Sequence, residues 1–208
     1  MCIRDRYYVL CLNKFIWNKQ EIIIPENIIK WYSQNMDIEN DNFFTSLPIG
    51  LERKRWSNGN KHILIDNMKN ISYEKEYLLY CNFTVRNNID LRHNILEKVK
   101  TLPNVLIRNI TDFKTYAEDI KKSKFVLCPT GNGIDTHRAW ETLYLGSIPI
   151  LYDNYHNRGA FENFKVMFIR NENDLDINIL ESFYSTNINN TNIVYEYDSI
   201  IKNKIKII

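Results

Sequence analysis

The stretch from Ser123 to Leu151 constrains the fold of this chain more than any other, because two short apolar runs flank a glycine loop and a segment with helical spacing. Phe125 to Cys128 and Ile148 to Leu151 have the composition of buried strands, and Thr136 to Leu145 repeats its apolar residues every three or four positions. Residues 129–134 lie between the first run and the helical segment and hold two of the chain's six glycines. The pattern predicts a strand, a loop, a helix and a second strand, which is the unit of a parallel α/β sheet.

The predicted helix begins directly after the glycine loop. Asp135 is the expected N-cap, and Gly146 is the expected C-terminal stop. A helix N-terminus that opens onto such a loop presents free N–H groups, which favour an anion. We therefore expect the loop from Thr130 to Gly133, including Gly131 and Asn132, to face a bound anionic group.

Two cationic side chains in the first helical turn strengthen this expectation. His137 and Arg138 follow Asp135 directly, at a helix end where the macrodipole disfavours cations by about 0.3–1 kcal/mol each. Such violations of a local rule tend to occur at functional sites, and a bound anion would remove the conflict. Glu141 shares their helix face, three residues after Arg138. An ordinary surface pair between Arg138 and Glu141 remains the alternative.

The rest of the chain from residue 72 onward alternates between apolar runs and helical segments. Further strands are predicted at Tyr77–Phe83, Val105–Ile110 and Val166–Ile169, and further helices at Leu91–Thr101, Phe113–Lys122, Gly159–Phe164 and Ile177–Phe183. Unbroken apolar strands that alternate with helices predict an α/β fold, a doubly wound, Rossmann-like parallel sheet covered on both faces. We assign residues 72–190 to this domain.

A second loop with suitable chemistry follows the first of these strands. The loop from Asn82 to Asn88 carries Arg86, and Arg92 lies on the helix that follows. Ligands of doubly wound sheets bind outside the carboxyl ends of the strands, where this loop is expected. Arg86 is either a phosphate contact or a plain surface arginine, and Arg92 is a weaker candidate of the same kind.

Residues 7–71 are less regular. Tyr7 to Leu12 resembles a strand, Pro25 to Tyr32 has the pattern of a short helix, and Phe43 to Gly50 is expected to be extended. Lys61 to Ile71 is predicted to be helical.

The two ends of the chain are interpreted separately. Residues 1–6, MCIRDR, match the in-frame reading of a sequencing-library tag, so we expect them to be an artefact outside the fold. Residues 191–208 are expected to form a C-terminal helix. Localisation depends on what precedes residue 7, with a cytoplasmic and a Golgi-lumen-like location both open.

Composition excludes several classes of partner. The net charge of +2 favours no nucleic acid, and no apolar run reaches the roughly 18 residues that a membrane span requires. The four cysteines lack the paired spacing of a metal site. Asp174 and Asp176 spell D-x-D, but they stand where a helix is expected to start and are interpreted as capping residues. We therefore predict no metal and no cofactor.

The string SKFVLCPTGNGIDTHRAWETLYLGSIPI, residues 123–150, resembles the signature of exostosin-like glycosyltransferases. That signature runs through a strand, a P-x-G loop, R-x-x-E and a strand of the G-x-x-P-V type. The string WYSQNMDIENDNFFTSLPIGLERKRW, residues 31–56, is similar to a segment that often precedes it. One departure is Thr130, because many relatives have arginine after the proline.

The resemblance implies a GT-B enzyme with two Rossmann-like lobes. Residues 72–190 would then be the nucleotide-sugar-binding lobe, and residues 7–71 the remainder of an acceptor lobe. The implied reaction moves a sugar from a nucleotide diphosphate donor to a hydroxyl of a glycan or another acceptor, with inversion and without a metal. Arg138 and Glu141 are the expected catalytic residues, with Glu141 on the ribose hydroxyls. The expected donor-binding residues are Thr130, Gly131, Asn132, Gly133, Asp135, His137 and Arg86.

Two other functions remain open. No catalytic base stands out in residues 7–71, and His137 is a weak candidate, so a truncated, non-catalytic nucleotide-binding module is the alternative. A dehydrogenase is disfavoured because no strand is followed by G-x-G-x-x-G.

Overall fold

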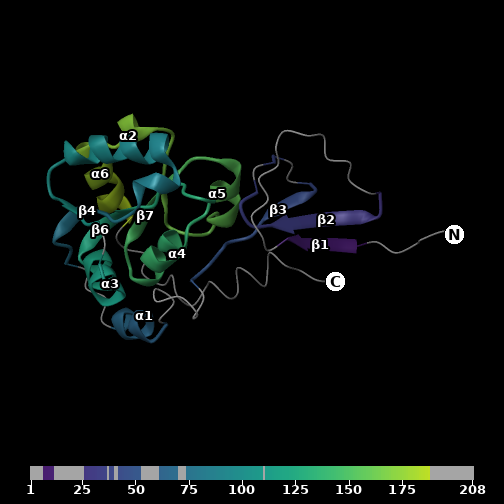
Figure 1. The fold of residues 1–208 in the computed structure, drawn as a ribbon, viewed down its shortest axis with the longest axis horizontal. Coiled ribbons are helices and arrows are strands. Elements are labelled where there is room, and N and C mark those ends of the chain that lie inside the picture. The colour runs from purple at the N-terminus through teal and green to yellow at the C-terminus, as the bar shows by residue number, and fades with distance from the viewer. Residues whose placement is uncertain are drawn as a thin grey trace.

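The computed structural model describes residues 7–11, 26–36, 38–39, 42–52, 61–69, 74–109 and 111–187. These residues form two parallel sheets, one of five strands and one of three (Figure 1). The strands of the larger sheet are β4 (Tyr77–Cys81), β5 (Val105–Ile107), β6 (Ser123–Leu127), β7 (Ile148–Tyr152) and β8 (Met167–Ile169).

The order of the larger sheet is β5-β4-β6-β7-β8, and all four pairings are parallel. The chain therefore starts in β4, steps to one side into β5, and then crosses to the other side into β6. This reversal creates a switch point between β4 and β6, where doubly wound sheets bind ligands outside the carboxyl ends of the strands. The prediction of an α/β fold with a doubly wound parallel sheet is confirmed.

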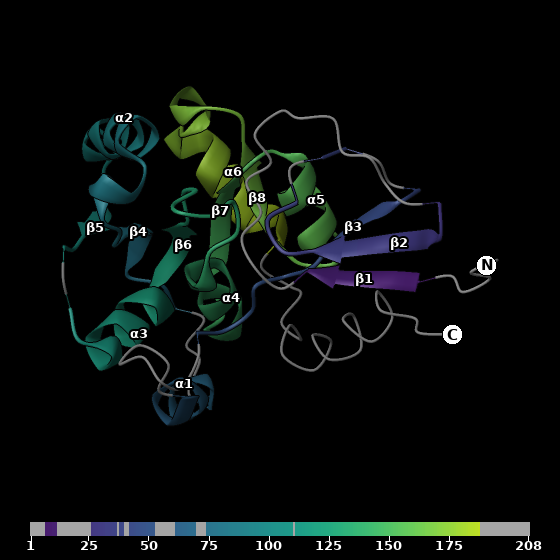
Figure 2. The same cartoon turned by 45° about the vertical axis from the view of Figure 1, so that its right-hand side comes forward.

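Helices cover both faces of the larger sheet, as Figure 2 shows. They are α1 (Lys61–Met68), α2 (Ile89–Lys100), α3 (Phe113–Lys121), α4 (His137–Tyr144), α5 (Tyr155–Ala160) and α6 (Ile177–Asn187), with short 3-10 turns η2 (Val85–Asn87) and η3 (Glu172–Asp174). Side chains alternate between the two faces, so Tyr80 and Val126 pack with α1, α3 and α4, while Leu79 and Phe125 pack with α2 and α6. Each face thus has its own core, and Trp140 in the first of them is fully buried.

The smaller sheet corrects one prediction. Its strands are β1 (Tyr7–Cys11), β2 (Ile28–Ser33) and β3 (Phe44–Ser46), in the order β1-β2-β3. The helix predicted over Pro25 to Tyr32 is wrong, because β2 is the central strand and pairs with both neighbours. Its sequence IIKWYS is rich in β-branched and aromatic residues, which fit a pleated surface better than a helix.

A second correction concerns the short helix predicted at Gly159 to Phe164. The helix begins earlier, as α5, because the Asn154 side chain accepts a hydrogen bond from the Asn157 N–H at 2.9 Å and caps it. The predicted C-terminal helix over residues 191–208 and the proposed artefact at residues 1–6 lie outside the described residues. Within those residues, no helix is long and apolar enough to cross a membrane.

The predicted C-terminal end of α4 is confirmed, and its N-cap lies one residue later than predicted. Gly146 has a φ of 73°, the Gly146 N–H donates to Leu143, and the Ser147 N–H donates to Thr142, which together form a Schellman motif. The predicted stop is confirmed. The N-cap position is Thr136 instead of Asp135, because the Asp135 carboxylate is committed to other partners.

We expect Gly146→Ala to lower the free energy of unfolding by about 1 kcal/mol, because a Cβ is disfavoured at positive φ. Urea denaturation of the variant and the parent chain measures this difference. Lys114→Ala, on the exposed surface of α3, is the control and is expected to stay within about 0.5 kcal/mol. An unchanged midpoint for Gly146→Ala would contradict the prediction.

Candidate functional site

The switch point between β4 and β6 is bounded by the two loops that leave these strands. Arg92 on α2 holds them together: its Nη1 donates to Thr84 O at 2.7 Å, its Nε to Thr130 O at 3.0 Å, and its Nη2 to Pro129 O at 3.0 Å. Arg92 is 4% exposed. Arg92, which the sequence offered as a weak ligand candidate, therefore fixes the two loops relative to each other.

The glycines of the second loop make room for two side chains. A Cβ on Gly131 would lie 2.4 Å from Arg92 Nη2, and a Cβ on Gly133 would lie 2.6 Å from Asn35 Oδ1. The Gly131 N–H donates to Gly133 O at 3.0 Å within the loop. Close packing of Arg92 and Asn35 is thus a direct structural reason for glycine at both positions.

Arg138 lies in the first turn of α4, as predicted, and is partly buried. Its Nε is buried and has no hydrogen-bond partner among the described residues. Burial, together with the positive charge of Arg138, lowers the pKa of Arg92 to about 10. Burial raises the pKa of Cys128 to about 12 against the opposing charge of Arg138. The guanidinium groups of Arg92 and Arg138 therefore lie close enough for their charges to interact. The hydrogen bonds of Arg92 go to carbonyl oxygens and not to a carboxylate.

Glu141 lies one helical turn after Arg138 and is 6% exposed. Its Oε2 accepts a hydrogen bond from the Tyr116 hydroxyl at 2.8 Å. Burial raises the pKa of Glu141, while the Tyr116 hydrogen bond and the Arg138 charge oppose the shift. The alternative of an ordinary surface pair between Arg138 and Glu141 is wrong, because the carboxylate is buried beside α3.

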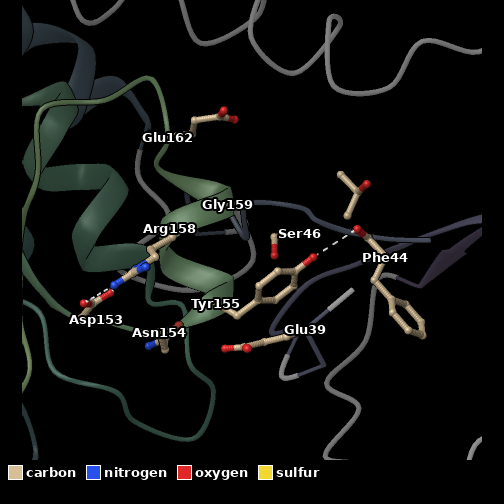
Figure 3. Close-up of a pocket in the computed structure, with 10 residues that line it drawn as sticks. Glu39, Phe44, Ser46, Asp153, Asn154, Tyr155, Arg158, Gly159 and Glu162 are labelled. Carbon is tan, nitrogen blue, oxygen red and sulfur yellow. Dashed lines mark hydrogen bonds and ion pairs between the residues drawn. The ribbon is translucent and has the colours of Figure 1, made fainter. Parts of the chain in front are cut away.

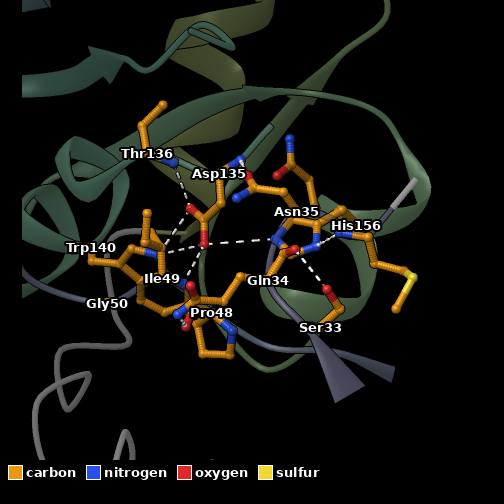
Figure 4. Close-up of polar contacts among 12 residues, drawn as sticks. Ser33, Gln34, Asn35, Pro48, Ile49, Gly50, Asp135, Thr136, Trp140 and His156 are labelled. Atoms are coloured by element: carbon orange, nitrogen blue, oxygen red, sulfur yellow. Dashed lines mark hydrogen bonds and ion pairs between the residues drawn. The ribbon is translucent and has the colours of Figure 1, made fainter. Parts of the chain in front are cut away.

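Asp135 stands at the centre of a network that joins the two sheets (Figure 4). Its Oδ2 accepts from the Ile49 N–H at 2.8 Å, its Oδ1 accepts from the Thr136 N–H at 2.7 Å, and both oxygens lie 2.9 Å from Trp140 Nε1. The Asp135 N–H donates to Asn35 Oδ1 at 2.9 Å. This carboxylate thus faces the segments that follow β2 and β3.

His156 contributes to the same network as a neutral imidazole. Its Nδ1 accepts a hydrogen bond from the Met36 N–H at 2.9 Å, so that nitrogen carries no proton. The proton of the neutral ring is then on Nε2, which lies 3.7 Å from Asp135 Oδ2. The contact between His156 Nε2 and Asp135 Oδ2 is therefore not an ion pair. A charged ring would need a proton on Nδ1, and that proton would break the hydrogen bond from Met36.

His137 also contacts the segment after β3. Its Nδ1 donates to Gly50 O at 2.7 Å, and its Nε2 lies 3.3 Å from Glu52 Oε2. Both partners are acceptors, so the imidazolium form would donate to each. His137 therefore lies at the junction between the two sheets.

The remaining predicted residues are placed as follows. The Thr130 carbonyl binds Arg92, Asn132 is exposed in the loop, and Arg86 is exposed on η2. Asp176 caps α6, since its Oδ1 accepts from the N–H groups of Asn178 and Ile179 at 2.8 and 3.2 Å. The expected capping role of that carboxylate is confirmed.

The structure thus brings together Arg138, Glu141 and the glycine loop, and directs Asp135 and His137 toward residues 35–52. Sequence reasoning missed Tyr116 and Asn35. Only the capping pattern of α3 hinted at the former, because Asp112 caps that helix and fixes which residues of α3 face α4. Nothing in the sequence indicated a contact across 100 positions between Asn35 and Asp135.

The doubly wound parallel sheet, with Arg92 and Arg138 beside its switch point, defines a Rossmann-like domain. A family model, the RXYLT1 C-terminal domain, matches residues 65–173, just over half of the chain. The chain belongs to this family, which places it among glycosyltransferase C-terminal domains. No curated protein matches the chain. The more specific exostosin-like assignment stays a prediction.

We expect Asp135→Asn to lower the free energy of unfolding by about 2–4 kcal/mol. In the variant, an amide NH₂ group replaces one carboxylate oxygen, so N–H groups that donate to that oxygen lose their acceptor. Urea denaturation measures the loss. Asp66→Asn, at an exposed ion pair on α1, is the matched control and is expected to change stability by less than about 0.5 kcal/mol. Equal effects of the two substitutions would contradict the central role of Asp135.

Glu141→Gln tests the pKa shift of the buried carboxyl group. A raised pKa means that the folded chain binds more protons than the unfolded chain, so the Glu141 contribution to stability falls as pH rises from the ordinary value of 4.5. The variant lacks this loss, and its stability relative to the parent is expected to increase with pH until the folded-state pKa is passed. Denaturation at a series of pH values measures it, with exposed Glu118→Gln as control. A pH-independent difference would contradict the shift.

Proposed function

We propose that this chain holds the nucleotide-sugar-binding lobe of a glycosyltransferase that moves a sugar from a nucleotide diphosphate to an acceptor hydroxyl. One observation carries the proposal: the Arg138 guanidinium lies at the switch point with a buried Nε that has no partner among the described residues. A buried N–H donor without an acceptor costs about 1–3 kcal/mol. A diphosphate oxygen would supply the missing acceptor and neutralise the repulsion between Arg92 and Arg138.

The neighbouring residues suit the other parts of such a donor. Glu141 in its ionised form offers acceptor oxygens to ribose hydroxyls, and the Tyr116 hydroxyl holds one of these oxygens in place. Arg92 is a positioning residue, because it fixes the two loops that would surround the phosphates. The N–H groups of the glycine loop and of the α4 N-terminus add partial positive charge to that of the arginines.

The proposed chemistry follows from this charge distribution. When the sugar leaves, negative charge grows on the diphosphate, and Arg138 with the α4 N-terminus stabilises that charge more in the transition state than in the ground state. These cationic groups supply the positive charge that the leaving group requires, so we propose a metal-independent transfer. Inversion requires a base for the acceptor hydroxyl, which we place on the side of the smaller sheet.

The arrangement of the two sheets supports a two-lobed, GT-B-like architecture. The segment after β2 reaches Asp135 and His156 through Asn35 and Met36, and the segment after β3 reaches Asp135 through Ile49. The carboxyl ends of both parallel sheets are thus directed at each other. In this proposal the smaller sheet belongs to the acceptor lobe, and the acceptor is a glycan or another hydroxyl compound.

The test is a calorimetric titration of the 208-residue chain with UDP, GDP and ADP in the presence of EDTA. We expect one diphosphate to bind, and Arg138→Gln to weaken it at least tenfold, which corresponds to about 1.4 kcal/mol. The same variant is expected to remain folded, which a thermal melt checks, because no described residue loses a hydrogen bond to the buried Nε. Arg170→Gln, at a side chain 79% exposed near β8, is the matched control.

Two results would overturn the proposal: a folded chain that binds none of the three diphosphates, or an Arg138→Gln variant that binds as tightly as the parent. Release of sugar from the matching nucleotide sugar separates an enzyme from a non-catalytic binding module. The module is the correct description if the diphosphate binds and no turnover occurs with any hydroxyl acceptor offered.

A further inference from the structure

Asn35 has an unusual backbone conformation. It follows β2 by two residues, and its φ of 54° lies in the left-handed region that residues other than glycine rarely adopt. In the part of the chain that the structure describes, Asn104 is the only other non-glycine residue with a positive φ. Asn104 is exposed in a loop, whereas Asn35 is only 8% exposed. A rare backbone conformation that is kept inside the protein indicates a role for the side chain.

The Asn35 side chain contacts the glycine loop of the larger sheet at two points. Its Oδ1 accepts a hydrogen bond from the Asp135 N–H at 2.9 Å (Figure 4). The side-chain amide also lies directly against Gly133, where an added Cβ would be 2.6 Å from Oδ1 and 3.1 Å from Nδ2. Asn35 therefore fixes the end of the glycine loop and the connection from that loop to α4.

Hydrogen bonds on both sides hold the Asn35 backbone in place. Before it, the Ser33 carbonyl accepts from the Leu47 N–H at 2.8 Å, within the smaller sheet. After it, the Met36 N–H donates to His156 Nδ1 at 2.9 Å, across the junction between the sheets. The conformation of Asn35 is thus set by contacts with both sheets, and its side chain is directed at the loop only in the docked arrangement.

Two side chains hold the glycine loop, and they come from different sheets. Arg92 donates to the carbonyls of Pro129 and Thr130 at the start of the loop. Asn35 holds the other end, where Gly133 leaves room for it. Arg92 belongs to the helices of the larger sheet, but Asn35 reaches the loop only while the smaller sheet is docked. The order of the loop therefore depends on the docking of the smaller sheet.

We propose that Asn35 is a positioning residue that keeps the glycine loop in the arrangement that receives the diphosphate, and thereby couples donor binding to docking of the smaller sheet. The coupling rests on the proposed function, whereas the ordering of the loop by Asn35 does not. Asn35 acts through Gly133 and Asp135 and does not itself contact the phosphates. Coupling between two sites is reciprocal, so a diphosphate that orders the loop also favours the docked state.

The smaller sheet keeps other contacts with the larger one when the Asn35 side chain is removed. The Ile49 N–H donates to Asp135 Oδ2 at 2.8 Å. The Tyr155 hydroxyl donates to Phe44 O at 3.3 Å (Figure 3). Glycine at position 35 also adopts the left-handed backbone readily. Asn35→Gly is therefore expected to fold, with the smaller sheet docked and the loop less ordered.

The first test is amide hydrogen exchange of the 208-residue chain without ligand. We expect residues 130–135 to exchange at least tenfold faster in Asn35→Gly than in the parent, because the loop has lost an acceptor and a packing partner. Asn104→Gly is the matched control, since Asn104 has a φ of 56° and its side chain donates to Glu76 O. Its loop is expected to change less than twofold.

Exchange in α6 is the internal reference for overall stability. Equal acceleration of the loop and of α6 in Asn35→Gly would indicate only a general loss of stability and would overturn the proposal. A loop that exchanges as it does in the parent would also overturn it.

The second test repeats the titrations with UDP, GDP and ADP on the same variants. We expect Asn35→Gly to weaken the diphosphate that the parent binds at least fivefold, and Asn104→Gly to weaken it less than twofold. In the parent, that diphosphate is expected to slow exchange in residues 33–36, and Asn35→Gly is expected to remove this protection. Parent-like binding by Asn35→Gly would overturn the coupling and leave the donor proposal intact.

Gly133→Ala keeps the test decisive if Asn35→Gly does not fold. Gly133 is not among the glycines with a positive φ, so its backbone accepts alanine, and the added methyl group displaces the Asn35 amide. We expect the same loss of loop protection and of diphosphate affinity. If the parent binds none of the three diphosphates, the donor proposal and the coupling both fail, and exchange of the loop decides whether Asn35 orders it.

Discussion

The arrangement of the two sheets depends on the hydrogen bonds that the Asp135 carboxylate accepts. It is 3% exposed, and a buried carboxylate is tolerated only when donors replace its water shell. Trp140 supplies one donor from within the larger sheet's own helix layer, and Ile49 supplies another from the segment after β3. Because the compensation comes from both sides, this charge is fully satisfied only in the docked state. The junction is therefore held by hydrogen-bond geometry as well as by apolar contact.

The partners of Asp135 and His137 affect which charged side chains face the switch point. Both side chains contact the segment that follows β3. Arg92 is satisfied by carbonyls and braces the loops, whereas the buried Nε of Arg138 has no described partner. In the proposed function, a diphosphate oxygen supplies the acceptor that this Nε lacks.

Sequence patterns predicted local structure well where one residue determines the geometry of its neighbours. Gly146 ends α4 because its positive φ permits the Schellman hydrogen bonds, and Asp176 starts α6 because its carboxylate reaches two N–H groups. The pattern failed at β2. Ile28, Ile29 and Trp31 have spacing compatible with a helix, but pairing with β1 and β3 overrides it. A six-residue run is too short for periodicity to distinguish the two states.

By itself, the sequence determined the alternation of strands and helices, the glycine loop, and the placement of Arg138 and Glu141 on one helix face. These features follow from side-chain spacing and backbone preference, which act over a few residues. Only the tertiary structure decided that β4 lies beside β6, that Tyr116 binds Glu141, and that Asn35 and Ile49 converge on Asp135. Those pairings join residues 25 to 100 positions apart. They depend on strand order and docking, which no local periodicity encodes.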